Sequence, residues 1–426
     1  MSKNNENKLV PKFRFPEFEN YGEWKEKKFD DLCKFVRGPF GRALKKEIFV
    51  NEGYAVYEQQ HAIYNDFTSF RYFISQEKYN ELKRFSVLPK DIIMSCSGTM
   101  GKFAVIPENP KEGVINQALL KLTVKPDYEI GFIKTSLELP VTQNKLLSQS
   151  AGGAIKNVVE VAQIKEINLL IPERKEQQKI ASCLSSLDEV ITSESQKLEV
   201  LKDHKKGLLQ NLLPQAGETV PKFRFKEFEN SGEWEVTELS ELGYLINGLT
   251  YSPEDVRHKG LLVLRSSNIQ DGLIDLKDCV YVREDINGAN QTKPKDILVC
   301  VRNGSKNLIG KNAIIPDGIP FATHGAFMTV FRAKNPAFVF QLFQSDYYDK
   351  QVRADLGATI NSINGKNFIK YEFPVPKNPK EQEKIADTLS SVDDLINAQQ
   401  QKIEALQLHK KGLLQGLFPK LNEVTA

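Results

Sequence analysis

The sequence predicts an α+β fold that is built twice: two mixed domains of strands and helices, each followed by a long helix. The first observation is a phrase that occurs twice, VPKFRFPEFENYGEW at Val10–Trp24 and VPKFRFKEFENSGEW at Val220–Trp234, with two of fifteen positions different. The second is that Glu176–Pro214 matches Glu381–Pro419 at 23 of 39 positions, at an offset of 205. Self-similarity of this kind marks a repeat architecture. The chain therefore passes twice through one plan.

Each of the longer repeated segments is predicted to be a coiled-coil helix. Its apolar residues recur at alternating spacings of four and three, which keeps them on one seam over several heptads. At about 1.5 Å per residue each helix is roughly 55 Å long, and Pro214 and Pro419 end the two helices at matched points. Two equivalent seams in one chain are expected to pair with each other; the alternative is that each helix packs on its own domain. The seam residues are Ile180, Leu184, Leu187, Ile191, Leu198 and Leu201, and then Ile385, Leu389, Val392, Ile396, Ile403 and Leu406.

The segments between these markers are predicted to mix strands and helices. GLLVLRSSNI and DILVCV have the composition of strands, whereas Tyr128–Leu147 and Phe338–Leu356 have a helical pattern and run into the glycine-bearing turns SAGGA and LGATI. The expected organisation is an opening element 1–24, a first domain 25–172, a helix 173–214, a linker with the second opening element 215–234, a second domain 235–376, a helix 377–419 and a tail 420–426.

Composition narrows the class of protein. The chain is 40% hydrophobic with a net charge of only +3, and no apolar run approaches the length of about 18 residues that a membrane span needs. The start, MSKNNENKLV, lacks the apolar centre of a secretory signal. Five scattered cysteines without a CxxC pair favour reduced thiols over a disulfide framework or a metal site. We therefore expect a cytoplasmic protein that binds no metal.

No catalytic set recurs in the two halves. A protein with two copies of one enzyme site is expected to keep its reactive residues in both, and no Ser/His/Asp or Cys/His set is kept. The sequence has no GxGxxG or GxxxxGK[ST] loop at a strand-to-helix turn, so nucleotide binding is unsupported. It also has no adenine-methyltransferase signature of the NPPY or DPPY kind. The sequence predicts a protein that performs no chemistry itself.

Two polar clusters keep their places in the halves but change their residues. Aligning Gly53 with Gly260 sets the run 58–61 opposite 265–268, each at the end of a predicted strand, and these side-chain types are the ones that read base edges. Two matched loops, 95–102 and 302–307, carry glycine and lysine, which suits backbone amides that approach phosphates. The structural alternative is that all are turn residues that bond their own backbone. With residues from the basic stretch 33–46 and from the glycine turns, the candidate DNA contacts are Arg37, Arg42, Glu58, Gln59, Gln60, His61, Ser97, Thr99, Lys102, Lys156, Arg265, Ser266, Ser267, Asn268, Arg302, Asn303, Ser305, Lys306, Asn307, His324 and Asn361.

This layout resembles the specificity subunit of type I restriction-modification systems. The resemblance covers essentially the whole chain and depends on the order and duplication of the PKFRF…GEW openings, the EQxKIAxxLSSxDxxI…HKKGLLQxL helices, and the PKDI and GAxI landmarks. It implies two α/β target-recognition domains separated by two long antiparallel helices, with each domain reading one half of a split, asymmetric DNA sequence. In that arrangement the phrase at Val10 is expected to pack near the end of the second helix, because its copy at Val220 follows the first.

The same resemblance implies the partners and cofactors. Two modification subunits would dock on the helices, carry S-adenosylmethionine and methylate adenine in double-stranded DNA. Two restriction subunits, with ATP and Mg, would complete the complex. The chain itself is expected to be a non-catalytic subunit that binds no cofactor and no membrane.

Three other functions remain open at this point. A stand-alone DNA-binding regulator would bind its site tightly without a methyltransferase. A coiled-coil scaffold whose domains bind proteins would show DNA binding that is unaffected by Arg265→Ala or Lys102→Ala. An enzyme with an undetected active site is the third.

Overall fold

The structure is a computed structural model that describes residues 9–40, 43–148, 161–215, 217–356 and 361–419. It forms two compact units: unit 1 is Met1–Glu194 with Ile403–Ala426, and unit 2 is Ser195–Lys402. The two long helices, α7 (Arg174–Leu212) and α12 (Pro379–Leu417), are divided between the units. Each unit therefore contains the first half of one helix and the last part of the other. A compact unit thus consists of a variable domain together with parts of both long helices.

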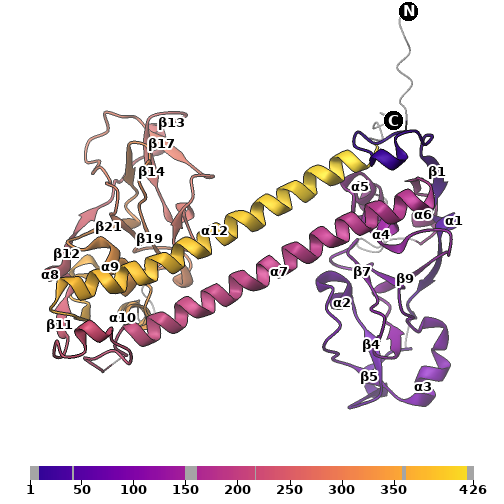
Figure 1. Ribbon diagram of the computed structural model, residues 1–426, viewed down its shortest axis with the longest axis horizontal. Coiled ribbons are helices and arrows are strands. Elements are labelled where there is room, and N and C mark those ends of the chain that lie inside the picture. Colours follow the sequence, from indigo (N-terminus) through magenta and orange to yellow (C-terminus); the bar gives the residue numbers. More distant parts are fainter. Residues whose placement is uncertain (1–8, 41–42, 149–160, 216, 357–360, 420–426) are drawn as a thin grey trace, which may run out of the picture. The chain divides into compact units, whose positions relative to one another are not determined.

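A four-stranded antiparallel sheet forms the centre of each unit, with the same strand order in both (Figure 1). Its strands β6 and β18 are nearly continuous apolar runs because both of their faces are covered, and every residue in them is buried. In unit 1 the order is β2 (Cys33–Arg37), β9 (Leu119–Val124), β6 (Ile92–Ser95) and β7 (Phe103–Val105). In unit 2 it is β12 (Gly243–Asn247), β21 (Met328–Ala333), β18 (Ile297–Cys300) and β19 (Asn312–Ile314).

A second four-stranded sheet in each unit carries the first polar cluster. It contains one parallel pair, β4 with β8 in unit 1 and β14 with β20 in unit 2. In unit 1 the order is β3 (Phe49–Val50), β5 (Phe73–Ile74), β4 (Tyr54–Tyr57) and β8 (Gly113–Ile115). In unit 2 it is β13 (Val256–Arg257), β17 (Val280–Val282), β14 (Leu261–Leu264) and β20 (Ala322–His324), and unit 2 also contains the small pair β15 (Ile269–Gln270) and β16 (Leu273–Ile274).

Two further strand pairs join the start of each variable domain to its end. In unit 1, β1 (Lys25–Lys28) pairs antiparallel with β10 (Asn168–Ile171). In unit 2, β11 (Glu235–Glu238) pairs in the same way with β22 (Glu372–Val375). The long helix begins within a few residues of the second strand of each pair, so the two ends of the domain and the start of the helix lie together.

The two helices that the sequence predicts inside the variable domains are each broken into two. Tyr128–Leu147 becomes α4 (Ile130–Glu138) and α5 (Pro140–Ser148), because the residue before Pro140 is held in an extended conformation and ends the first helix. Phe338–Leu356 becomes α9 (Pro336–Leu342) and α10 (Asp346–Leu356). The shorter helices are α1 (Phe29–Leu32), α2 (Gln59–Tyr64), α3 (Gln76–Glu81), α6 (Val161–Lys165), α8 (Leu239–Leu242) and α11 (Gly365–Phe368).

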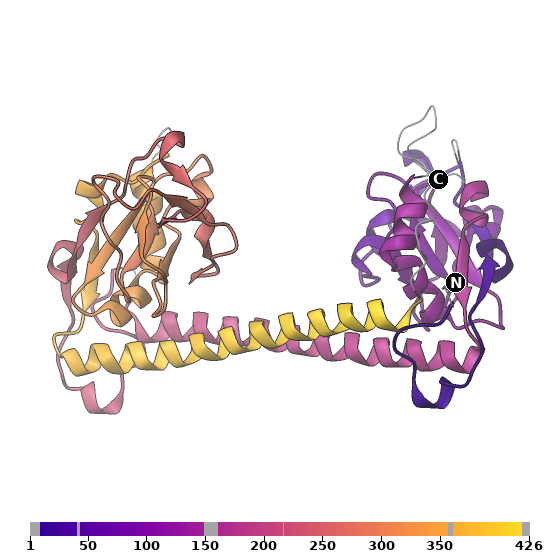
Figure 2. The same cartoon turned by 90° about the horizontal axis from the view of Figure 1, so that it is seen from above.

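Burial along α7 and α12 follows the predicted seam. All twelve seam residues are buried or half-buried. In unit 1 the first seam residues of α7 share a core with the last turns of α12, and in unit 2 the roles of the helices are exchanged. Charged residues form ion pairs between the helices, Lys410 with Asp188 in unit 1 and Lys205 with Asp393 at 2.6 Å in unit 2. Within each unit the two helices thus run side by side in opposite directions (Figure 2).

The repeated opening phrase forms a buried ion pair with the start of the long helix of its own module. Arg14 Nε and Nη2 donate to the Glu176 carboxylate at 2.9 and 2.7 Å, and the indole N–H of Trp24 donates to the same carboxylate at 3.3 Å. The phrase in unit 2 makes the same three contacts, from Arg224 and Trp234 to Glu381, which is the counterpart of Glu176 in the second long helix. The residues that the two phrases share therefore form the same polar cluster in both units.

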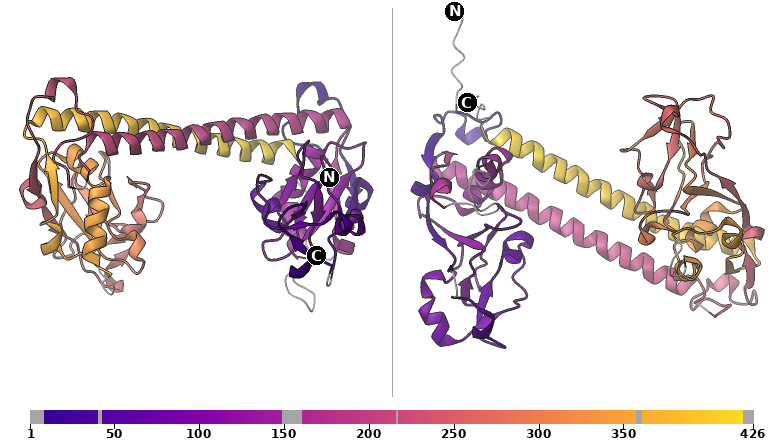
Figure 3. Two further views of the ribbon diagram at one scale, coloured as in Figure 1. Left: turned by 90° about the horizontal axis from the view of Figure 1, so that it is seen from below. Right: turned by 180° about the vertical axis from the view of Figure 1, so that it is seen from behind.

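Each phrase also reaches the end of the other long helix. The backbone N–H of Phe13 donates to the carbonyl of Gly416 at 2.8 Å, and that of Phe223 donates to the carbonyl of Asn211 at 2.8 Å. Figure 3 shows the opening segment of unit 1, in indigo, beside the end of α12. The expectation that the phrase at Val10 packs near the end of the second helix is confirmed.

Candidate nucleic-acid interface

The first polar cluster lies directly after β4 in unit 1 and after β14 in unit 2. Glu58 occupies the N-cap position of α2, and Arg265 occupies that of the short 3-10 helix Ser266–Asn268. In both units the residue three positions further on accepts the backbone N–H of the cap: His61 Nδ1 from Glu58 at 2.8 Å, and Asn268 Oδ1 from Arg265 at 2.9 Å. The two clusters therefore have one backbone plan and different side chains.

Three of the predicted base contacts are buried, and for them the expectation is corrected. His61 is 1% exposed, and Asn268 and His324 are 0% exposed. His61 and Asn268 are structural capping residues that also bond the backbone of the following loop. His324 lies in β20, where Nε2 donates to the carbonyl of Ile246 at 2.9 Å, and burial lowers the pKa of its imidazole below the usual value. A fully covered side chain cannot meet a base edge.

The second polar cluster lies beside the first in each unit. In unit 1, Gln59 Nε2 donates to the carbonyl of Thr99 at 3.5 Å. In unit 2, Asn303 Nδ2 donates to the hydroxyl of Ser266 at 3.1 Å. Two segments about 40 residues apart in the sequence thus form one polar surface in each domain, with different residues on the two surfaces. We call these two surfaces the reading edges.

The other predicted contacts fall into three groups by exposure. Exposed residues are Gln60, Thr99, Lys102, Arg302, Ser305, Lys306, Asn307 and Asn361; half-buried ones are Arg37, Glu58, Gln59, Ser97, Arg265, Ser266, Ser267 and Asn303. Arg42 and Lys156, together with the SAGGA turn and all of LGATI after Leu356, lie outside the residues that the structure describes. Nothing in the structure tests contact with DNA, so the exposed and half-buried residues stay predictions.

Each reading edge also has an exposed phenylalanine that the sequence analysis missed. Phe40 is 68% exposed with the Arg37 guanidinium 5.7 Å from its ring centre, and Phe327 is 58% exposed with that of Arg302 at 5.3 Å. Phe40 follows β2 and Phe327 precedes β21, so both lie at the same end of the central sheet although they come from different strands. In unit 2 the ring of Phe327 lines an open pocket of about 540 Å³ together with Arg265, Ser266, Ser267 and Asp278.

Among the described residues, no group of three His, Cys, Asp or Glu side chains has an arrangement that would hold a metal ion. No helix in the described part of the chain is long and apolar enough to cross a membrane.

Comparison with known proteins identifies the family. The family model described as "Type I restriction modification DNA specificity domain" matches the chain twice, at residues 21–203 and 231–408. The MjaVIII type I restriction enzyme specificity subunit of Methanocaldococcus jannaschii is 24% identical over 406 residues, which cover 92% of this chain and 91% of that protein. The EcoKI specificity subunit of Escherichia coli is 28% identical over 196 residues, 43% of this chain and 42% of that protein.

Two solved structures have the same fold. The S subunit of a type I restriction-modification system from M. genitalium matches with a TM-score of 0.63 and 16% identity, over 97% of this chain and 100% of that one. A chain from a structure described as showing complex assembly and conformational transition of the type I R-M system matches with a TM-score of 0.52 and 15% identity, over 93% of this chain and 97% of that one.

Proposed function

This chain belongs to the type I restriction modification DNA specificity family and contains two copies of its domain, and we propose that each domain reads one half of a bipartite, asymmetric DNA sequence. The observation that carries the proposal is the pair of reading edges. They occupy the same place in the repeated fold, and they differ in the side chains that face solvent. A shared backbone with different polar side chains is what two readers of different half-sites need.

The second part of the proposal concerns partners. As a specificity subunit, the chain is a recognition component and not an enzyme of the system. We propose that two modification subunits dock on the helices α7 and α12, one in each unit, and supply S-adenosylmethionine and the methyl transfer. Two restriction subunits, with ATP and Mg, would join through the complex. The repeat supports this stoichiometry, because the two helix segments are identical at 23 of 39 positions.

A matched pair of exposed aliphatic side chains on the helices indicates where docking occurs. Val190 of α7 is 44% exposed and Leu395 of α12, its counterpart at an offset of 205, is 56% exposed. Neither is a seam residue. Large aliphatic residues kept outside the seam at the same place in both copies are suited to an apolar contact with a partner.

We expect Val190→Asp to remove one modification subunit from the complex, and Val190→Asp with Leu395→Asp to remove both. A buried unpaired carboxylate at an interface typically costs several kcal/mol. The measurement is the mass of the complex co-purified with the cognate modification subunit. Val256→Asp is the control, since Val256 is also an exposed aliphatic residue, 42% exposed, on the edge strand β13. Full stoichiometry in the double variant would place docking elsewhere.

The experiment that tests the reading function is long-read detection of methyladenine in cells that carry the cognate modification subunit. We expect a split motif that appears only when this chain is present, and both half-sites are then read from one data set. If the modification subunit is active and co-purifies with the chain, yet no chain-dependent motif appears, the proposal is wrong.

A further inference from the structure

An ion pair at the reading edge has opposite polarity in the two domains. The residue that follows the strand is acidic in unit 1 and basic in unit 2, and its partner lies 13 residues further along the chain in both. In unit 1, Arg71 Nη2 donates to Glu58 Oε1 at 2.8 Å. In unit 2, Arg265 Nη2 donates to Asp278 Oδ2 at 2.8 Å. The order is acid then base in one domain, and base then acid in the other.

The surrounding backbone shows that these two ion pairs are equivalent. The strand before each pair follows a glycine of nearly the same conformation, φ 147° at Gly53 and 144° at Gly260. The buried residues His61 and Asn268 then fix the loops that lead to Arg71 and Asp278. One ring nitrogen of His61 bonds the carbonyl of Ser69 at 3.1 Å, and Asn268 Nδ2 donates to the carbonyl of Asp278 at 2.9 Å.

In each pair the residue further along the chain, Arg71 or Asp278, is the more exposed one, and we call it the outer member; Glu58 and Arg265 are the inner members. The side chain of Arg71 is 65% exposed and that of Glu58 is 12% exposed. Asp278 is 65% exposed and Arg265 is 33% exposed. The inner member therefore holds the outer one in position at the surface. Arg71 is restrained further by Tyr72, whose ring centre is 4.5 Å from the guanidinium carbon.

The inner members each keep one polar atom that has no protein partner. Glu58 Oε2 and Arg265 Nε are both buried and make no hydrogen bond within the described structure. Only one side of the Glu58 carboxylate and one side of the Arg265 guanidinium bind the outer residue. The charge of Arg265 also offsets that of Asp278, so an acidic residue at this edge does not repel a phosphate backbone as strongly as it would alone.

We propose that Arg71 and Asp278 are specificity-determining residues of the two domains, with Glu58 and Arg265 as their positioning residues; this rests on the proposed reading of DNA. A guanidinium held by a carboxylate and an aromatic ring is preorganised to donate to O6 and N7 of guanine. A carboxylate accepts a hydrogen bond from the amino group of cytosine. At this position the first domain selects guanine in its half-site, and the second domain selects cytosine.

The test uses the full chain in complex with its cognate modification subunit, and methylation of a duplex library in which both half-sites are varied. With Arg71→Gln, discrimination for guanine at one position of the first half-site should fall roughly 5- to 150-fold, with the second half-site unchanged. Asp278→Asn should remove the cytosine preference at one position of the second half-site only. Arg71→Lys keeps the charge without the fork and should relax the same base as Arg71→Gln.

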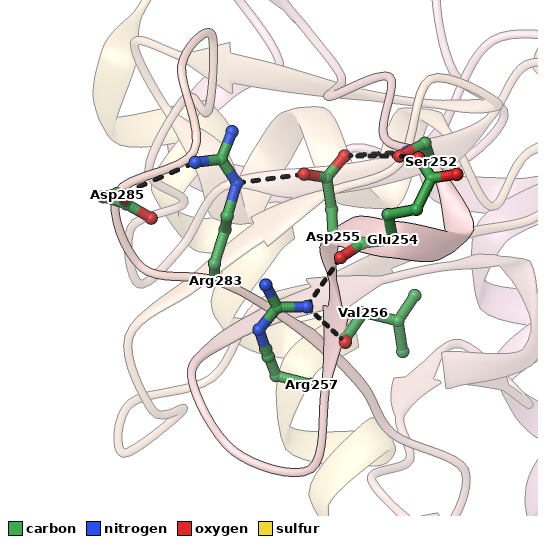
Figure 4. Close-up of polar contacts among 7 residues, drawn as sticks. All are labelled: Ser252, Glu254, Asp255, Val256, Arg257, Arg283 and Asp285. Atoms are coloured by element: carbon green, nitrogen blue, oxygen red, sulfur yellow. Dashed lines mark hydrogen bonds and ion pairs between the residues drawn. The ribbon is translucent and has the colours of Figure 1, made fainter.

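A matched ion pair in unit 2 provides the control. Arg283 Nε donates to Asp255 Oδ1 at 2.9 Å (Figure 4). Arg283 follows the end of β17, whereas Asp278 precedes its start. Arg283→Gln should leave both half-sites unchanged. Glu58→Gln separates positioning from folding, because it should relax the same base as Arg71→Gln while the modification subunit still co-purifies.

The outcomes separate this inference from the function on which it rests. If the unaltered chain directs methylation to a split motif, and Arg71→Gln, Arg71→Lys and Asp278→Asn all leave that motif unchanged, the inference is wrong and the reading function stands. The inference is also wrong if Arg71→Gln and Asp278→Asn relax one and the same half-site. If the unaltered chain directs no methylation, both fail together.

Discussion

Glu176→Ala is expected to lower the free energy of unfolding by roughly 3–5 kcal/mol, the usual cost of breaking a buried ion pair. Arg14 is 7% exposed and Glu176 is 1% exposed, so the variant leaves a guanidinium in the interior with most of its partners removed. The indole N–H of Trp24 loses its acceptor as well. Urea unfolding of the purified chain, followed by circular dichroism, measures the effect. Glu381→Ala should cost unit 2 a similar amount, because the same contacts are repeated there.

The chain offers an exposed ion pair as the control for this result. Lys28 and Glu166 are 2.6 Å apart with side chains 56% and 64% exposed, and Glu166→Ala should barely move the unfolding midpoint because solvent screens such pairs. A double variant, Arg14→Met with Glu176→Leu, should recover much of the stability, since apolar groups of similar volume often replace a buried ion pair well. Equal effects of Glu176→Ala and Glu166→Ala would mean that the buried cluster does not hold the opening phrase in place.

Gly248→Ala is expected to disable the reading edge of unit 2, with a loss of roughly 2–4 kcal/mol in stability. A Cβ at Gly248 would lie 2.1 Å from the carbonyl oxygen of Gly325. The obstacle is backbone, which is fixed by hydrogen bonds of Leu249 to His324 at 2.7 Å and of Ala326 to Leu249 at 2.9 Å. To make room, the segment that carries Phe327 must move. Methylation of the library should then lose its preference for one half-site.

Two other glycines sharpen this prediction. Gly38→Ala should do the same to unit 1, because a Cβ at Gly38 would lie 1.8 Å from the carbonyl oxygen of Asn116. Gly304→Ala is the control in the second polar cluster of unit 2, since nothing lies within 4 Å of its Cβ position. We expect it to unfold at the same urea concentration as the unaltered chain. If Gly248→Ala also retains both half-sites, the close approach of these two segments does not maintain the reading edge.

The repeat could be predicted from the sequence because identity of letters at fixed offsets needs no structure to interpret. The heptad seam was predictable for a similar reason: periodicity reports which side of a helix is apolar, and all twelve predicted positions are buried or half-buried. The breaks within the helices Tyr128–Leu147 and Phe338–Leu356 were not predicted. The break at Leu139 was readable from Pro140, whereas the one after Leu342 has no proline within the gap.

The sequence predicted the two polar clusters, which the structure brings together in each unit, and their contact with DNA stays a prediction. Residue type alone predicted that His61, Asn268 and His324 contact bases. In the structure these three side chains are buried, and hydrogen bonds to the backbone stabilise them there. Phe40 and Phe327 were missed because an aromatic residue near a strand is usually part of a core. Arg71 and Asp278 were missed because no motif marks a partner in a loop.

The sequence by itself determined the duplicated plan, the long helices and the places where the two copies differ, because these follow from identity and periodicity along the chain. Only the tertiary structure decided which side chains reach solvent at the reading edges. It also decided that Glu58 and Arg71, and Arg265 and Asp278, are partners of reversed polarity. Such pairs form because the sheet and its loops bring two side chains together in space, and the order of residues along the chain does not show which side chains will meet.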